Sequence, residues 1–468
     1  MYCHLTDPAI RNIAVLDMTH GGVIIARKLK ELEFNVTGVD VYGTLSMEQC
    51  RSLEADGISV VNKSCTIEDV DLVISPVHLY PDHVMLEQAK KKQVPIISHH
   101  RAVGEILSFT DVGEYPLIIE VTGTKAKTST ASLLADMISR KLTILLHTSR
   151  GLELWEDGVC QLIHKGLSIA PGSILQVMDI AGSLDKKIEA YVLEISLGVT
   201  GCGSVSVITT LDMDYMIADK TSMASEAKVK SLLNCPENAL IVLNENCRKV
   251  LKQLNIPLAS ENISTFNILE NGESVTSDAD YCLNMSKNSF SITCEEEQIE
   301  FHLAEGYDAK SYMTAFAASC AAAFEISIPL ENVKETIQQF RGLQGRMQER
   351  EEEGLKILDN SNSGMDIASV EKALDLCLKR KQKVIMVLGE EAAQVCEGLP
   401  PESVADFLGG RLEDIDELIL IGERMKPMAT GNIHYAESFD LGKTQAIEIT
   451  RKKGTTEVII ALCVKCFR

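Results

Sequence analysis

Basic residues and aromatic residues are both scarce in this chain of 468 residues. Lys and Arg number 45 against 67 Asp and Glu, so the formal net charge is −22. Aromatic side chains make up 5% of the chain and include a single Trp. Nucleic-acid binding requires a basic face for the phosphates, and single strands are usually stacked on aromatic rings. The composition therefore argues against a nucleic-acid partner.

Long apolar runs are also missing. The longest, such as 71–77 and 384–388, have the length of a strand and fall far short of the roughly 20 residues of a membrane-spanning helix. The N-terminal residues lack the basic segment and apolar core of a signal peptide. We therefore expect a cytoplasmic protein without a membrane partner. The hydrophobic share of 45%, with 30 Gly and 12 Pro, is that of globular domains rather than of a disordered chain.

The 14 cysteines are spread along the chain, mostly as single residues inside apolar segments. In a large cytosolic protein such cysteines usually act as small buried hydrophobic residues. Cys463 and Cys466 form the one close pair, and a lone pair without further Cys or His partners is weak evidence for zinc. We interpret Cys463 as part of the last strand and Cys466 as a residue of the tail.

Strand-length apolar runs alternate with helical segments along most of the chain, which predicts α/β domains with doubly wound parallel sheets. At about 150 residues per domain the length corresponds to three domains, which we place at 1–110, 111–340 and 341–468. The turn at Gly21 and Gly22 lacks the spaced glycines of a dinucleotide-binding fold, so we do not expect NAD. In the first domain we expect strands at 13–17, 36–40, 72–76 and 94–98 and a helix at 23–32.

The second domain differs from its neighbours at 263–301, where short apolar runs are joined by Asn, Gly and Ser. This pattern predicts an antiparallel excursion from the parallel sheet. The other elements expected in the second domain are strands at 117–121, 190–195, 205–210 and 241–244 and helices at 129–140 and 311–324. In the third domain we expect strands at 356–358, 384–388, 417–421 and 458–462.

The sharpest local signal is the segment 120–130, which follows a predicted strand and opens a predicted helix. In that setting backbone N–H groups at the start of a helix form a cradle for phosphate. Lys127 adds a positive charge for the β- and γ-phosphates, and the Thr128 hydroxyl is a ligand for Mg²⁺. The alternative is an ordinary helix start capped by Thr. The predicted nucleotide-binding residues here are Thr122, Gly123, Thr124, Lys125, Ala126, Lys127, Thr128 and Ser129.

This loop resembles that of the Mur ligases, which include folylpolyglutamate synthetase. Their loop reads G-T-x-G-K-T/S, and here Ala126 replaces the glycine before the lysine. We expect Ala126 to be tolerated because the loop presents its N–H groups without a positive φ at that position. Further segments similar to Mur-ligase motifs follow at 193–196, 209–215, 222–228 and 342–349, with Tyr215 where the family has a histidine.

The resemblance implies a three-domain α/β architecture. A central P-loop domain that binds ATP is flanked by an N-terminal Rossmann-like domain for the acceptor and a C-terminal Rossmann-like domain that closes over the nucleotide. It further implies that Glu194 and Thr128 hold Mg²⁺, and that a carbamylated Lys228 binds a second Mg²⁺. Lys127, Glu194 and Lys228 are then the catalytic residues, while Arg346 and Asp359 contact the nucleotide. The implied cofactors are ATP and Mg²⁺.

The first domain offers candidates for recognising the acceptor. Several of its side chains lie just beyond predicted strands, where ligands bind in doubly wound sheets. Histidines donate hydrogen bonds to carboxylates, and arginine pairs with them through its planar fork. We therefore expect these residues to face the cleft over the phosphate loop and to bind an acidic, multi-carboxylate substrate. The predicted substrate-binding residues are His20, Tyr42, His78, His99, His100 and Arg101.

Three segments of the first domain, at 16–22, 39–42 and 99–105, are similar to a branch of Mur-ligase homologues from methanogenic archaea. This resemblance implies that ATP activates a propionate of a nickel tetrapyrrole as an acyl phosphate, and that a ring carbon then closes a six-membered carbocycle. One alternative is a ligase that adds amino acids to pseudomurein or peptidoglycan. Another is a nucleotide-binding regulatory module that has lost catalysis. For the assembly, we expect a monomer or a homodimer.

Overall fold

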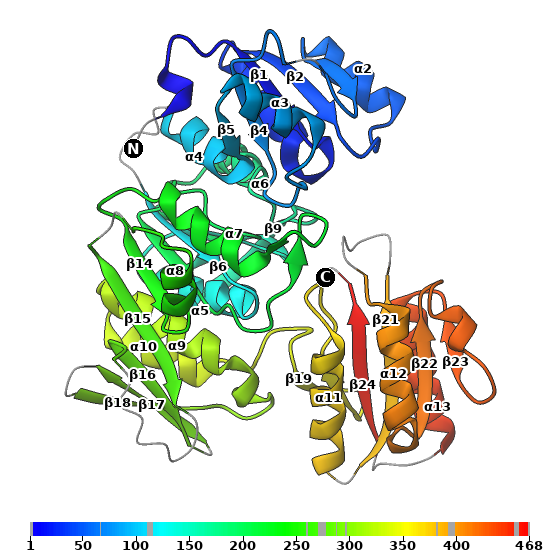
Figure 1. The fold of residues 1–468 in the computed structure, drawn as a ribbon. Coiled ribbons are helices and arrows are strands. Elements are labelled where there is room, and N and C mark those ends of the chain that lie inside the picture. Colours follow the sequence, from blue (N-terminus) through cyan, green and yellow to red (C-terminus); the bar gives the residue numbers. More distant parts are fainter. Residues whose placement is uncertain are drawn as a thin grey trace. The chain divides into compact units, whose positions relative to one another are not determined.

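The computed structural model describes residues 3–65, 67–109, 116–258, 261–269, 278–286, 288–294, 297–380, 382–391, 398–453 and 458–466. The chain forms two compact units (Figure 1). The first comprises Met1–Phe301 and Met313–Thr336, and the second comprises His302–Tyr312 and Ile337–Arg468. Both are α/β, which confirms the predicted fold class. No helix among the described residues is long and apolar enough to cross a bilayer.

The first unit begins with a sheet of five parallel strands in the order β3-β2-β1-β4-β5. Along β1, Ile13 and Val15 enter one hydrophobic core, and Ala14 and Leu16 enter the core on the opposite face. Helices therefore cover both faces, as expected for a parallel sheet. The strands are β1(Asn12–Leu16), β2(Asn35–Asp40), β3(Ser59–Asn62), β4(Leu72–Ser75) and β5(Ile96–Ser98). The helices are α1(Val23–Glu31), α2(Met47–Ala55), α3(Val84–Lys92) and α4(His99–Phe109).

The same unit holds a second sheet of eleven strands, in the order β18-β17-β16-β15-β14-β11-β6-β10-β7-β8-β9. Its strands are β6(Leu117–Thr122), β7(Ile144–Thr148), β8(Gly151–Glu156), β9(Val159–His164), β10(Ala190–Glu194), β11(Val205–Ile208), β14(Leu240–Asn244), β15(Ile263–Leu269), β16(Tyr281–Met285), β17(Ser289–Cys294) and β18(Glu297–His302). A small hairpin of β12(Met216–Ile217) and β13(Ser222–Met223) lies apart from it. The helices are α5(Lys127–Ser139), α6(Ser173–Ser183), α7(Ala224–Ser231), α8(Cys247–Gln253), α9(Met313–Glu325) and α10(Leu330–Gln339), which ends in the second unit.

Two local expectations for this sheet need correction. In the segment 263–301, β15 pairs in parallel with β14 and β16 pairs in parallel with β15, and the antiparallel pairing begins only with β17. Alternating apolar residues identify a strand but not its direction, because direction is set by the connection. The antiparallel hairpin β8–β9 was not predicted, although Asp157 and Gly158 at its turn are a hairpin signal.

The second unit contains a six-stranded sheet in the order β19-β20-β24-β21-β22-β23, parallel except for β19. Along β24, alternate side chains enter hydrophobic cores on opposite faces, and Cys463 and Cys466 are buried free thiols. The strands are β19(Gln348–Glu352), β20(Leu355–Asp359), β21(Lys383–Glu390), β22(Glu417–Ile421), β23(His434–Ala436) and β24(Val458–Lys465). The helices are α11(Ile367–Lys379), α12(Pro401–Arg411) and α13(Phe439–Lys453).

Candidate active site

The predicted phosphate loop joins the end of β6 to the start of α5, as a phosphate cradle requires. β6 lies between β10 and β11, and all three run in parallel, so their carboxyl ends meet at this edge. Gly123 has a φ of 147°, and a Cβ there would lie 2.1 Å from the Thr209 hydroxyl oxygen. The loop therefore needs glycine at 123 for both conformation and space. The helix begins two residues earlier than predicted, at Lys127 rather than 129.

The expectation that the loop avoids a positive φ at Ala126 is wrong. This residue precedes the first residue of α5 with a φ of 64° and a ψ of −1°, in the left-handed region. A left-handed alanine costs roughly 1–2 kcal/mol, so the fold holds the loop in this shape against a local preference. The family's glycine at this position would adopt the same backbone without that cost.

The loop is clamped by the segment that follows β11. Thr124 donates its backbone N–H to the Thr210 carbonyl at 2.9 Å and its hydroxyl to the Asp212 carbonyl at 2.5 Å. The Thr209 hydroxyl donates to the carbonyl of Lys125 at 2.5 Å. The 209–215 segment, singled out by its motif, therefore fixes the shape of the loop.

Thr128 and Glu194 meet at the carboxyl ends of the strands. The Thr128 hydroxyl donates to Oε2 of Glu194 at 2.7 Å, and both side chains are buried. The same carboxylate oxygen accepts the backbone N–H of Ser149 at 3.1 Å, and the Ser149 hydroxyl lies 3.4 Å from that of Thr128. Sequence reasoning missed Ser149. Its only signal was its place just after a strand.

The other predicted residues of the loop lie at the end of β6 and in the first turn of α5. Lys127 is the first residue of α5, and its Nζ donates to the carbonyl of Gly123 at 3.0 Å. Thr122 ends β6 and donates its hydroxyl to the Ile195 carbonyl at 2.9 Å. Ser129 is buried in the first turn of α5.

Lys228 lies in α7 and is completely buried. Its Nζ is 5.0 Å from the ring centroid of Tyr215, the residue that replaces the family's histidine. Asp214, next to Tyr215, accepts the N–H of Ser225 at the start of α7. The structure thus brings the 209–215 segment and the helix of Lys228 together.

Arg346 and Asp359 belong to the second unit. Asp359 ends β20, is fully buried, and accepts a hydrogen bond from Nη1 of Arg350 at 2.8 Å. The main chain of Arg346 is held by Tyr312, whose hydroxyl donates to the Arg346 carbonyl. Arg350 was not predicted, because the motif ends before it and only the antiparallel pairing of β19 with β20 brings it near Asp359.

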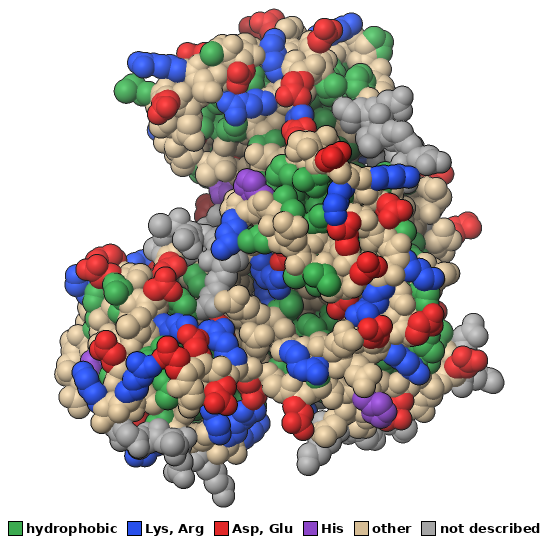
Figure 2. All heavy atoms as spheres, turned by 180° about the vertical axis from the view of Figure 1, so that it is seen from behind, with side chains coloured by type: hydrophobic (Ala, Val, Ile, Leu, Met, Phe, Trp, Pro, Cys, Tyr) green, Lys and Arg blue, Asp and Glu red, His purple; other side chains and the backbone are tan. Residues whose placement is uncertain are grey.

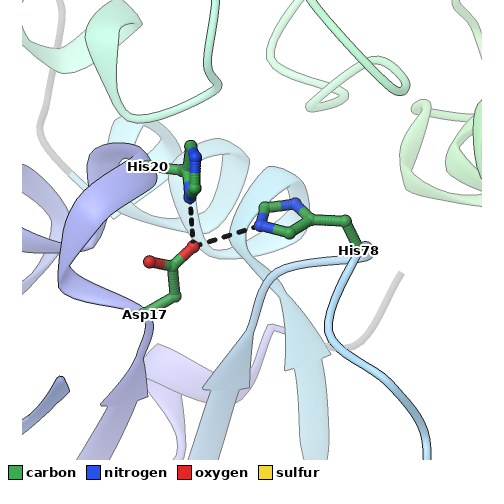
Figure 3. Close-up of side chains that lie close together, drawn as sticks. All are labelled: Asp17, His20 and His78. Carbon is green, nitrogen blue, oxygen red and sulfur yellow. Dashed lines mark hydrogen bonds and ion pairs between the residues drawn. The ribbon is translucent and has the colours of Figure 1, made fainter. Parts of the chain in front are cut away.

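A second constellation lies at the carboxyl edge of the N-terminal sheet (Figure 3). Asp17 follows β1, His20 lies in the turn before α1, and His78 follows β4. Oδ2 of Asp17 is 2.8 Å from Nδ1 of His20 and 3.1 Å from Nε2 of His78. Burial raises the pKa of the Asp17 carboxyl, but the hydrogen bonds from both histidines outweigh it and hold that pKa well below its usual range. The ring of Tyr42 meets that of His20 edge to face, with centroids 6.2 Å apart.

The expectation of an open cleft is wrong for His99, which is buried, whereas His100 is buried but lines a pocket together with Val77 and Ser98. Both are buried at the start of α4, where Nε2 of His99 bonds the Leu16 carbonyl at 2.8 Å and Nε2 of His100 bonds the Ser196 carbonyl at 2.7 Å. Loss of hydration lowers the pKa of each imidazole to about 4. They are therefore neutral at pH 7 and carry no positive charge for a carboxylate.

Arg101 is engaged within its own helix. Its Nε donates to Oε1 of Glu105 at 2.8 Å, and Glu105 also accepts hydrogen bonds from Nδ1 of His4 and the backbone of Leu5. This network ties the N-terminal segment to α4. The guanidinium that we expected to meet a substrate carboxylate thus already donates, through Nε, to a carboxylate of the protein.

The fold and the phosphate loop together define a class. Solved structures of similar fold include MurF from Acinetobacter baumannii, with a TM-score of 0.55 and 13% identity over 80% of this chain and 79% of that one. MurF from Thermotoga maritima in complex with ADP has a TM-score of 0.55 and 14% identity over 92% of this chain and 90% of that one. The chain has the α/β fold of the Mur ligases, as the resemblance implied.

Sequence comparison narrows the class. Residues 349–466 match the family described as "Coenzyme F430 synthetase CfbE, C-terminal domain". The coenzyme F(430) synthetase of Methanosarcina acetivorans is 43% identical over 98% of this chain and 99% of that protein. A D-glutamate-adding ligase of Lactococcus lactis is 24% identical over 78% of this chain and 74% of that protein. The chain belongs to the coenzyme F(430) synthetase family and is a ligase, and the cell-wall alternative is not favoured.

Proposed function

We propose that the chain completes a nickel tetrapyrrole in the cytoplasm by ATP-dependent closure of a carbocyclic ring. The observation that supports this most directly is the pairing of Thr128 with Glu194 beside the phosphate loop, in a member of the coenzyme F(430) synthetase family. A carboxylate oxygen of the substrate attacks the γ-phosphorus of ATP, the bond to the bridging oxygen breaks, and ADP leaves. A ring carbon then attacks the acyl carbon, phosphate leaves, and the attacking carbon loses its proton.

The oxygen atoms at the loop fit Mg²⁺. The Thr128 hydroxyl lies within hydrogen-bond range of both the Glu194 carboxylate and the Ser149 hydroxyl, and Mg²⁺ prefers oxygen ligands. When bound, Mg²⁺ would neutralise charge on the phosphates. We propose that Thr128 and Glu194 hold the ion and that Lys228, once carbamylated, holds a second one.

Groups of the chain itself would bind the phosphates and the rest of the nucleotide. N–H groups of the loop from Gly123 to Thr128 face the anion at the start of α5, and Lys127 exchanges its bond with the Gly123 carbonyl for the γ-phosphate. We propose that Arg346 and Asp359 contact the nucleotide from a third domain, with domains at 1–110, 111–340 and 341–468. Removing water from the site would protect the acyl phosphate from hydrolysis.

For the substrate, we propose contacts at His20, Tyr42 and His78, which are all partly exposed. His99, His100 and Arg101 then act indirectly. The bond from His99 to the Leu16 carbonyl supports the turn that carries Asp17 and His20, and the bond from His100 to Ser196 ties α4 to the segment after Glu194.

A direct assay tests the proposal. The purified protein is incubated with Mg²⁺, ATP and a nickel tetrapyrrole that carries the open propionate. We expect one phosphate released per tetrapyrrole and a product lighter by one water. Release of phosphate only with a uridine-linked peptide and an amino acid would overturn the proposal in favour of amide-bond formation.

A further inference from the structure

Asp17 is a buried charged residue with an unfavourable backbone conformation. It is fully buried and has a φ of 69°, a left-handed value that is uncommon outside glycine. Its Oδ1 accepts the N–H of Thr19 at 2.8 Å, while Oδ2 faces both His20 and His78. Strain of this kind persists only where the surrounding structure enforces it, and it gathers at functional sites.

The turn after Asp17 reverses the chain, so that the His20 side chain lies next to the Asp17 carboxylate. It is a single π-helical turn in which His20 and Gly21 have non-helical backbone angles. A Cβ at Gly22 would lie 2.0 Å from the Asp17 carbonyl oxygen, and one at Gly21 would lie 3.3 Å from the Cα of Gly172. Gly22 therefore permits the turn to close onto Asp17, and Gly21 permits the turn to pack against Gly172.

The three side chains match a known type of ligand set. One carboxylate oxygen and two imidazole nitrogens all lie within 4.8 Å of one another (Figure 3). Ligands at metal–nitrogen distances near 2.0 Å in a tetrahedral site are roughly 3.3 Å apart. The two separations from the carboxylate oxygen, 2.8 Å and 3.1 Å, need to widen by only a few tenths, and the two imidazole nitrogens lie within 4.8 Å of each other. Two imidazoles and one carboxylate suit Zn²⁺, Ni²⁺ or Co²⁺ better than Mg²⁺.

We propose that Asp17, His20 and His78 form a binding site for a divalent transition-metal ion. The ion takes the place of the N–H protons that Nδ1 of His20 and Nε2 of His78 now direct at the carboxylate. In each neutral imidazole that single proton moves to the other ring nitrogen, which leaves the first nitrogen free to ligate the ion. Three protein ligands leave a coordination position open, as in catalytic rather than structural sites. The side chains of His20 and His78 are 34% and 25% exposed, so that position is reachable from solvent.

The open coordination position suits a carboxylate of the substrate, an inference that rests on the proposed function. A substrate with several carboxylates must approach a chain of net charge −22, in which acidic and basic side chains intermingle over the face drawn in Figure 2. Arg101, the basic residue expected to bind it, is engaged with Glu105. A metal ion on Asp17, His20 and His78 would supply the missing positive charge and accept one substrate carboxylate.

Metal binding is tested without ATP or tetrapyrrole. Protein stripped with chelator and returned to buffer with millimolar Mg²⁺ is titrated with Zn²⁺, Ni²⁺ and Co²⁺ by calorimetry, and Co²⁺ is also followed by its visible absorption. The Mg²⁺ is included to fill sites made of oxygen ligands, so that the titrated ions report on sites with nitrogen ligands. The titrations use a Cys160→Ser background, since Cys160 is the exposed cysteine among the described residues. We expect one ion per chain.

Variants then locate the ion. His20→Ala and His78→Ala should each weaken metal binding by about 100-fold or more. Loss of a residue that only hydrogen-bonds to a metal ligand already costs about 10–100-fold, and loss of a ligand should cost at least as much. Asp17→Asn should do the same, and circular dichroism checks its fold. His164→Ala is the matched control, since His164 is exposed on β9, and it should bind as the parent does.

The outcomes separate the site from the proposed function. Metal binding that is lost in the His20 and His78 variants supports the site even if ring closure fails. Absence of a stoichiometric ion, or binding unchanged in both variants, overturns the site. If the variants lose only the affinity for a nickel tetrapyrrole and free ions do not bind, the histidines contact the substrate directly and the ion site is also overturned.

Discussion

The hydroxyl of Thr128 donates a 2.7 Å hydrogen bond to Oε2 of Glu194, although 66 positions separate the two residues in the chain. The contact forms because β6 and β10 are parallel neighbours, so the helix start after one strand meets the last residue of the other. It places a hydroxyl and a carboxylate side by side where a phosphate-bound cation would lie.

Replacing Glu194 with Gln tests this pair. The amide keeps the shape and still accepts from Thr128, but it removes the negative charge that Mg²⁺ requires. We expect kcat for phosphate release to fall by about 10²–10³-fold, the scale of losing one electrostatic contact in a transition state. Glu189→Gln, just before the start of β10, is the control and should stay near the parent. Equal losses in both variants would contradict the assignment.

Lys127 tests the phosphate loop itself. Lys127→Ala removes the charge that we assign to the γ-phosphate, and we again expect a loss of about 10²–10³-fold in turnover. Lys141→Ala, exposed just beyond the other end of α5, should have no such effect. Steady-state kinetics with ATP varied measure both. Full activity of Lys127→Ala would show that the loop does not bind nucleotide.

Ala126→Gly measures the cost of the left-handed alanine. Glycine relieves roughly 1–2 kcal/mol of backbone strain but loses about 0.5–1 kcal/mol to greater freedom in the unfolded chain. We expect stability to rise by no more than about 1.5 kcal/mol and ATP affinity to change by less than tenfold. Ala126→Val should instead be destabilised, because a β-branched residue disfavours positive φ. Urea unfolding and nucleotide titration report the two quantities, and a gain of several hundredfold in affinity would mean that the native loop is too strained to function.

The neutral state of His100 predicts a pH dependence. Burial lowers its pKa from 6.5 to about 4, so between those values the unfolded chain binds more protons than the folded one. Stability contributed by neutral His100 is complete above pH 6.5 and is lost as the pH falls toward 4. One such histidine costs about 1.4 kcal/mol per pH unit, or about 2 kcal/mol from pH 6.5 to pH 5.

Urea unfolding of His100→Gln at several pH values measures that contribution. Its stability should fall less steeply than that of the parent below pH 6.5, whereas the exposed control His164→Gln should follow the parent. Parallel curves for His100→Gln and the parent would show that His100 is protonated in the folded state.

The strand–turn–helix that carries the predicted phosphate loop could be predicted because every part of it is local. A strand, a turn with Gly123 and a helix that begins with Lys127 and Thr128 follow one another directly, and the backbone N–H groups of a helix start need no distant partner. The α/β class follows from the same kind of local signal, because buried parallel strands are continuous apolar runs.

The tertiary structure alone decided which polar groups meet. Asp17 was expected inside a strand, and only the fold shows it after the strand, with a positive φ and with His20 and His78 at its carboxylate. His99 and His100 were expected to bind substrate over the phosphate loop, but the fold buries both at the start of α4, where each bonds a backbone carbonyl.

The order of residues thus determined many of the buried strands and helices and the strand–turn–helix of the predicted phosphate loop, because these depend on neighbours along the chain. Other features depend on which elements pack together. They are the burial of polar side chains, the positive φ of Ala126 and the hydrogen-bond partners of Ser149 and Arg350. Packing is a property of the whole fold, and the same polar residue is a charged ligand at a surface and a neutral hydrogen-bonding group in an interior.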